Sequence, residues 1–161
     1  DDLSGDRDRG PPVSVLPLSL QRRIRTEIRS IWDANWQATD LLVRWQENDV
    51  SADRPDATAT PQWLSLEITY GAERPIAFGG GRGQSERLKF GSVVIRGYTS
   101  LGDGDAVLLD LIGAAESVFR SKRVGPLSFI GDISGFDTAR SEDGAWHMEA
   151  SLAAWEYRFR G

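Results

Sequence analysis

The sequence predicts a single α/β domain in which two amphipathic helices accompany a sheet. Three observations lead to this fold class. Apolar residues recur at helical spacing after Ser19 and again after Asp105. The segments 63–70 and 146–159 alternate apolar and polar residues, as half-buried strands do, and 92–98 is rich in β-branched residues, which also favour a strand. A chain of 161 residues is also a length that one hydrophobic core serves well.

The composition argues against several classes of function. A net charge of -5 does not suit a general nucleic-acid binder, because such proteins neutralise phosphates with clustered Lys and Arg. The chain has no cysteine, and His147 is its only histidine, so thiolate metal sites and histidine-based catalytic groups lack the partners they need. We therefore expect no catalysis, no cofactor and no metal. No apolar run approaches the roughly 18 residues of a membrane-spanning helix, so we expect no membrane contact.

The first residues are expected to lie outside the domain. Residues 1–18, DDLSGDRDRGPPVSVLPL, mix charges with glycine and proline and show no apolar period. Such a segment buries too little apolar surface to fold alone. We therefore predict that this N-terminal segment, 1–18, is an extended arm and that the folded domain covers 19–161.

The first helix is predicted to begin after Ser19, a suitable N-cap, and to end near Trp36. Its apolar residues fall on one face: Leu20, Ile24, Ile28, Ile31 and Trp32. The opposite side carries three arginines one turn apart: Arg22, Arg25 and Arg29. Such a stripe is either a solvated face or a surface that meets a partner, and the sequence leaves both interpretations open.

Two strands joined by an acidic loop are expected next. Residues 41–45 are predicted to form a short strand, and 46–61 a polar loop. The loop carries the acidic residues Glu47, Asp49, Asp53 and Asp56. In the following strand, 63–70, the side that begins with Leu64 is apolar, whereas the other side carries Trp63, Ser65, Glu67 and Thr69. We expect only the first side to be buried.

Residues 79–91, GGGRGQSERLKFG, raise the question of nucleotide binding. A P-loop needs G-x-x-x-x-G-K-[ST] before a helix, whereas here glutamine follows the last glycine of the run and a strand comes next. The dinucleotide fingerprint fails because no helix starts here. About twenty residues separate the strands 63–70 and 92–98, more than a hairpin loop requires. We therefore predict a flexible, Gly-rich hairpin arm over 72–89, and a passive long hairpin is the alternative.

The second helix is predicted to begin at Asp103 or Asp105 and to stop within 122–125, before a proline. It should pack on the sheet through one face: Leu108, Leu111, Ile112, Ala115 and Phe119. A strand over 127–133 and a polar turn over 137–144 follow.

The last strand, 146–159, alternates with a change of phase. Trp146 and Met148 share one parity, whereas Trp155 and Tyr157 share the other. Because one extra residue moves all later side chains to the opposite face, we predict a β-bulge near Ala153.

The order of these elements and several local sequences resemble the tail terminator proteins of long-tailed, non-contractile bacteriophages, the lambda-type family. The similarity covers about 20–160. It rests on RIRTEIRSIWDANW, WLSLEITYG, AFGGGRGQSERLKFGSVVIRGY, the GDGDA entry into the second helix and the closing DGAWHMEASLAAWEYRF.

The resemblance implies a mainly antiparallel mixed sheet with two helices on one face and a long Gly-rich hairpin. It implies a structural virion protein, not an enzyme, that assembles in the host bacterial cytoplasm. Six copies would form a ring at the head-tail junction, capping the head-proximal end of the tail tube and stopping its polymerisation. The partners would be copies of the chain itself, the tail tube protein and the head-tail connector or stopper, while DNA passes through the lumen without specific binding.

Three sets of residues become interface candidates in such a subunit. The hairpin arm would contact the tube or a neighbouring subunit through Arg74, Ile76, Phe78, Arg82, Arg87 and Lys89. The acidic loop, Glu47 to Asp56, is a candidate lumen or rim element, and the Arg22, Arg25, Arg29 stripe would face a partner. A neighbouring connector protein or a gene transfer particle subunit remains an alternative. A small intracellular ligand-binding or enzymatic domain would need convergent polar residues in a cleft, which the sequence does not indicate.

Overall fold

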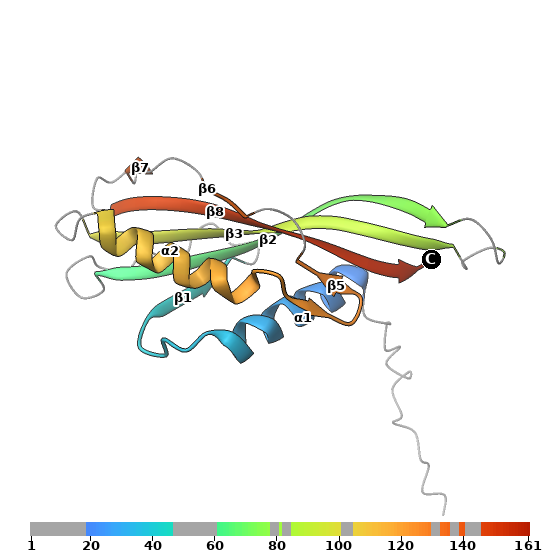
Figure 1. Cartoon of the computed structure of the whole chain (residues 1–161), viewed down its shortest axis with the longest axis horizontal. Coiled ribbons are helices and arrows are strands. Elements are labelled where there is room, and N and C mark those ends of the chain that lie inside the picture. Colours follow the sequence, from blue (N-terminus) through green and yellow to red (C-terminus); the bar gives the residue numbers. More distant parts are fainter. Residues whose placement is uncertain are drawn as a thin grey trace, which may run out of the picture.

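The computed structural model of the chain describes residues 19–46, 61–77, 81, 85–100, 105–129, 133–135, 139–140 and 146–161. It has an α+β fold, as the sequence predicts (Figure 1). The helices are α1 (Leu20–Asn35) and α2 (Asp105–Phe119). The long strands are β2 (Gln62–Ala77), β3 (Glu86–Ser100) and β8 (Trp146–Arg160). The short strands are β1 (Leu42–Trp45), β4 (Arg123–Val124), β5 (Leu127–Ser128), β6 (Ile133–Gly135) and β7 (Ala139–Arg140).

The strands form one mixed sheet whose centre is antiparallel. Its order is β1-β2-β3-β8-β5-β4, and β6 and β7 also pair with β8. Among the described strands, only β1 runs parallel to its neighbour, β2. Three pieces of chain therefore follow one another along the outer edge of β8, while β3 occupies its inner edge.

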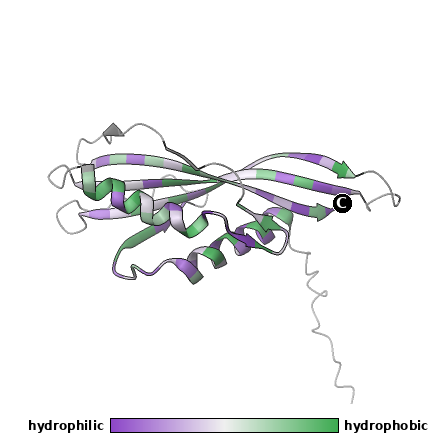
Figure 2. Ribbon diagram, in the orientation of Figure 1, coloured by the Kyte–Doolittle hydropathy of each residue, from purple (hydrophilic) through white to green (hydrophobic). Residues whose placement is uncertain are grey.

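Both helices cover the same face of this sheet and build the main core with it (Figures 1 and 2). The predicted cap is confirmed, because Ser19 Oγ accepts a hydrogen bond from the Arg22 backbone N–H at 3.2 Å. Ile28 of α1, Phe119 of α2 and Trp155 of β8 all lie in one buried cluster. Within the described residues, neither helix is long and apolar enough to cross a membrane.

The hairpin of β2 and β3 is longer than predicted. The two strands stay paired as far as Ala77 opposite Glu86, so the prediction of a flexible arm over 72–89 is wrong for 72–77 and 86–89. Two register shifts, between Tyr70 and Glu73 and between Pro75 and Ala77, accommodate a sequence that does not alternate. The β3 side is held throughout by β8, which the local sequence could not reveal.

A second, smaller core lies on the face opposite the helices. It consists of Trp63, Tyr98 and Trp146, with Trp63 stacked on Tyr98 at a ring centroid distance of 4.1 Å. The expectation that the Trp63 side of its strand is exposed is therefore wrong, because Trp63 is only 4% exposed. Aromatic rings on both faces let this part of the sheet bury both sides.

The predicted bulge near Ala153 is absent. The register of β3 and β8 runs without a shift from Glu86 opposite Arg160 to Ser100 opposite Trp146. The change of phase has another cause: Trp146 belongs to the smaller core, whereas Trp155 points to the helices on the other face. The buried face changes along the strand while the backbone stays regular.

The region after α2 is more broken than predicted. The expected strand 127–133 is split into β5 and β6, and β7 lies within the expected turn 137–144. A tight turn at Gly125, whose φ of +54° suits glycine, joins β4 to β5. Asp105 is the first residue of α2, and the alternative cap Asp103 lies outside the described residues.

We expect Gly91→Ala to destabilise the fold, because a Cβ at this position would collide with the Thr69 carbonyl and the Trp155 ring. The loss should be about 1–3 kcal/mol or more in the free energy of unfolding. Gly113→Ala is the matched control, since a Cβ there meets nothing within 4 Å and alanine favours the helix by about 0.5–1 kcal/mol. Urea denaturation of both variants tests this, and equal midpoints would contradict the close approach of Trp155 to β3.

Candidate protein-interaction site

The strands β2, β3 and β8 continue to the N-terminal end of α1 and past it as a three-stranded extension, which we call the arm. It comprises residues 71–77, 86–90 and 156–160. In Figure 1 the three ribbons run on together beyond the N-terminal end of α1. Because side chains alternate across a strand, the register assigns each arm residue either to the face on which the helices lie, the helix-side face, or to the opposite outer face.

The helix-side face is organised in rows that cross the three strands. From the base outward the rows are Tyr70, Gly91 and Trp155; then Glu73, Lys89 and Tyr157; then Pro75, Arg87 and Phe159. The first turn of α1 lies over the first row, since the Tyr70 hydroxyl donates to the Gln21 carbonyl at 3.3 Å. The third row lies furthest from the helices.

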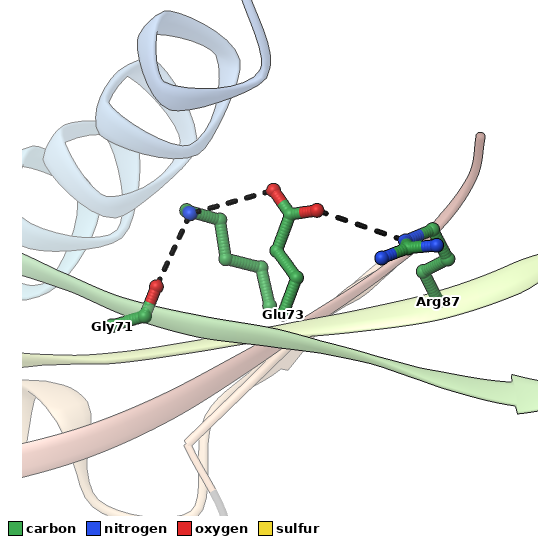
Figure 3. Close-up of polar contacts among 4 residues, drawn as sticks. Gly71, Glu73 and Arg87 are labelled. Atoms are coloured by element: carbon green, nitrogen blue, oxygen red, sulfur yellow. Dashed lines mark hydrogen bonds and ion pairs between the residues drawn. The ribbon is translucent and has the colours of Figure 1, made fainter.

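A polar network ties the second row to its neighbours (Figure 3). Lys89 Nζ donates to the Gly71 carbonyl at 3.2 Å and lies 3.5 Å from Glu73 Oε1. Glu73 Oε2 lies 3.7 Å from Arg87 Nε, so one carboxylate bridges two cations. Lys89 is only 7% exposed. Its ammonium group therefore contacts Gly71 and Glu73 within the arm and is not presented to a partner.

A hydrogen-bonded pair joins the same row to α1. Burial raises the pKa of the Glu27 carboxyl, and the Arg23 charge and a hydrogen bond with the Tyr157 hydroxyl act in the opposite direction. Burial is also the main cause that raises the pKa of Tyr157, and the negative charge of Glu27 raises it further. Tyr157 therefore keeps its proton at neutral pH, and its hydroxyl can donate a hydrogen bond to the Glu27 carboxylate. This contact fixes α1 over the base of the arm.

The outer face of the arm is lined by arginines. The Arg74 guanidinium lies 5.0 Å from the ring centroid of Phe90, a cation-π distance. Leu88 lies between Arg74 and Arg158 in the register. Beside it, a hollow of about 210 Å³ opens between the arm and the β4-β5 turn. Its lining residues are Leu88, Arg123, Gly125, Pro126, Ser128, Glu156 and Arg158.

The arm brings together several of the predicted interface residues. Arg74 is exposed on the outer face, and Arg87 keeps 34% of its side chain exposed on the helix-side face. Ile76 is half-buried at a register shift. The remaining candidates lie outside the described residues: Glu47, Asp49, Asp53, Asp56, Phe78 and Arg82.

The sequence interpretation missed the contribution of the last strand. Arg158 adds positive charge to the outer face, and Phe159 adds an apolar group to the helix-side face. The alternation in EYRFR, 156–160, carried this signal, because it predicts that arginines and aromatic rings point to opposite sides. What it could not show was that β8 lies against β3.

The predicted stripe on α1 is a separate surface. Arg22, Arg25 and Arg29 line a shallow groove of about 560 Å³, together with Thr26, Ser30 and Asp33. Arg29 stacks on the Trp45 ring at 5.1 Å and is half-buried, whereas Arg22 is exposed. The stripe is thus partly used for packing β1 against α1, and only its first turn stands out from the helix. The exposed Arg22 agrees with a solvated face, and contact between the stripe and a partner stays a prediction.

Comparisons with known proteins bear on the fold. No protein-family model matches the chain, and no curated protein sequence matches it. Among solved structures, 18 chains match. One of them has a TM-score of 0.54 and 16% sequence identity, over 84% of this chain and 96% of that chain, and its name carries no functional description. At this identity the likeness shows the fold alone.

We expect Lys89→Ala to cost about 1–3 kcal/mol of unfolding free energy, because it leaves the Gly71 carbonyl and Glu73 without their donor. Arg87→Ala, which removes a half-exposed ion pair, should cost about 0–1 kcal/mol. Lys89→Met keeps the aliphatic stem and separates packing from the polar contacts. Chemical denaturation of the three variants tests the order, and an equal cost for Lys89→Ala and Arg87→Ala would contradict the network.

Stability should depend on pH through Glu27. Its pKa in the folded chain lies above the usual 4.5, so the folded state binds the proton more tightly than the unfolded state does. The resulting stabilisation is present below pH 4.5 and is lost as the pH rises through the raised pKa. Relative to Glu27→Gln, the wild-type chain should therefore gain stability when the pH falls from 7 to 4. Urea denaturation at several pH values measures the difference, and a flat difference would contradict this.

Proposed function

We propose that the chain is a tail terminator subunit of a long-tailed, non-contractile bacteriophage. In this role, six copies form a ring on the head-proximal end of the tail tube, end its polymerisation and join it to the head-tail connector. DNA passes through the ring without specific binding. The protein acts through its surfaces, without catalysis, cofactor or metal, as part of the virion.

The arm is the observation that supports this proposal most directly. Ordering a strand costs backbone entropy. Where helices or another layer cover a sheet, the burial of its side chains offsets this cost. Here the sheet runs on beyond its helices and carries charged side chains on both faces: Arg87 on one, Arg74 and Arg158 on the other. A projection of this kind suits a subunit whose specificity lies in contacts with other subunits.

The charge of the arm also differs from that of the chain. The arm holds five basic and three acidic side chains, whereas the whole chain holds 19 and 24. A basic extension on an acidic subunit can be attracted to the acidic surface of another copy or of the tube protein. Such complementarity favours head-to-tail contacts, which generate closed rings when the rotation between copies closes.

A connector ring next to the terminator, or the equivalent part of a gene transfer particle, could use the same surface. Location in the particle separates these roles. A reconstruction that shows the chain at the head-proximal end of the tube supports the terminator. If the particle lacks it at the head-tail junction, the proposal is wrong.

We expect the double variant Arg82→Ala with Arg87→Ala to give tails of abnormal length while the subunit stays folded. Arg87 contributes only a half-exposed ion pair to stability, but its charge is available to a partner. Arg120→Ala is the control, since this side chain is 60% exposed, follows directly after α2 and is not part of the arm. Electron microscopy of particles measures the tail lengths. Normal tails from the double variant would indicate that these arginines do not take part in capping.

A further inference from the structure

We infer that the last part of the N-terminal segment, residues 13–18, docks on the helix-side face of the arm of its own chain. The sequence there is VSVLPL, directly before the cap of α1. The inference rests on the arm and the position of α1, and it holds whether or not the chain is a tail terminator.

The docking surface is the third row of the arm with the margin of the core beside it. Phe159 and Leu20 are only partly buried, although both pack against the main core. Pro75 is exposed in the same row as Phe159. Among the described residues, α1 begins at Leu20 and contacts the first two rows, through Gln21 and Glu27. The apolar groups of the third row thus lie beyond the end of α1.

The chain enters α1 next to this surface. The Gln21 carbonyl accepts a hydrogen bond from Tyr70 in the first row, which places the first turn of α1 at the base of the arm. In Figure 1 this end of α1 points towards the arm. The third row lies about 13 Å beyond the first, since two residues advance a strand by about 6.6 Å. Six extended residues span about 20 Å, so 13–18 can cover that distance.

The chemistry of the segment matches the surface. Its apolar side chains, Val13, Val15, Leu16 and Leu18, would cover Phe159 and Pro75. Further upstream, residues 1–8 carry four aspartates and one arginine, which suits the exposed part of Arg87. Because the segment is tethered a few residues away, its effective concentration at the arm is in the millimolar range, so weak contacts suffice. A segment from another copy lacks this advantage in dilute solution.

Hydrogen exchange of the purified chain tests the inference. In the full chain, amides of 73–77 and 158–160 should exchange about fivefold more slowly than in a chain that lacks 1–18, because docking suppresses local opening of the arm. Amides at the centre of the β3-β8 pair should not change. Equal exchange in the arm would overturn the inference, and so would protection that rises with protein concentration, because it would indicate docking between copies.

A cross-linking experiment uses the full chain, so its result does not depend on whether the chain that lacks 1–18 folds correctly. The protein has no cysteine, so Ser14→Cys with Pro75→Cys adds a single possible disulfide, which needs Cα atoms within about 7 Å. Oxidation should give an intramolecular bond. Ser14→Cys with Leu109→Cys is the control, since Leu109 is exposed on α2 and should not cross-link within one chain. Failure of the first pair to close, or its closure only between chains, would overturn the inference.

Discussion

The uninterrupted pairing of β3 with β8 is the constraint on which the rest of the structure depends. Each strand has 15 residues, and the register holds from one end to the other. Because side chains alternate with a period of two, a slip of one residue would turn Trp155 away from the helices and Trp146 away from the smaller core. Two cores on opposite faces therefore specify one register more strictly than either core could alone.

This pairing also determines where the helices can lie. Gly91 leaves room for the Trp155 ring against the backbone of β3, and the same face carries Tyr70 and Tyr157 towards α1. The two tyrosines meet α1 through hydrogen bonds, to the Gln21 carbonyl and to Glu27. Side chains from β2 and β8 thus hold α1 where the sheet extends past the end of the helix.

The sequence predicts what depends on local periodicity, and fails where distant strands decide. The spacing from Leu20 to Trp32 and the cap at Ser19 suffice for α1, because helical contacts lie three or four residues apart. Residues 72–77 do not alternate, so their sequence alone does not predict a strand. They form one because they pair with β3, which in turn pairs with β8. The change of phase in β8 is likewise a consequence of having two buried faces.

The candidate site follows the same division. The sequence predicts a charged hairpin that carries Arg74 and Arg87, because a run rich in glycine and arginine lies in one segment. The structure places both residues on the paired strands β2 and β3. The interior position of Lys89 was not predictable, since its partners, Gly71 and Glu73, lie across a strand pair with two register shifts. Arg158 joined the outer face only through the β3-β8 register.

The edge of β2 limits the way in which another molecule can recognise the arm. Beyond Leu66, where β1 ends, no described strand pairs with this edge. An open edge is normally a template on which a further strand adds, yet here Pro75 offers no N–H and two bulges interrupt the line of backbone groups. An incoming chain would find too few successive donors and acceptors to extend the sheet. Binding to the arm must therefore depend on the shape and charge of its side chains, and stacking of subunits edge to edge into fibrils is disfavoured.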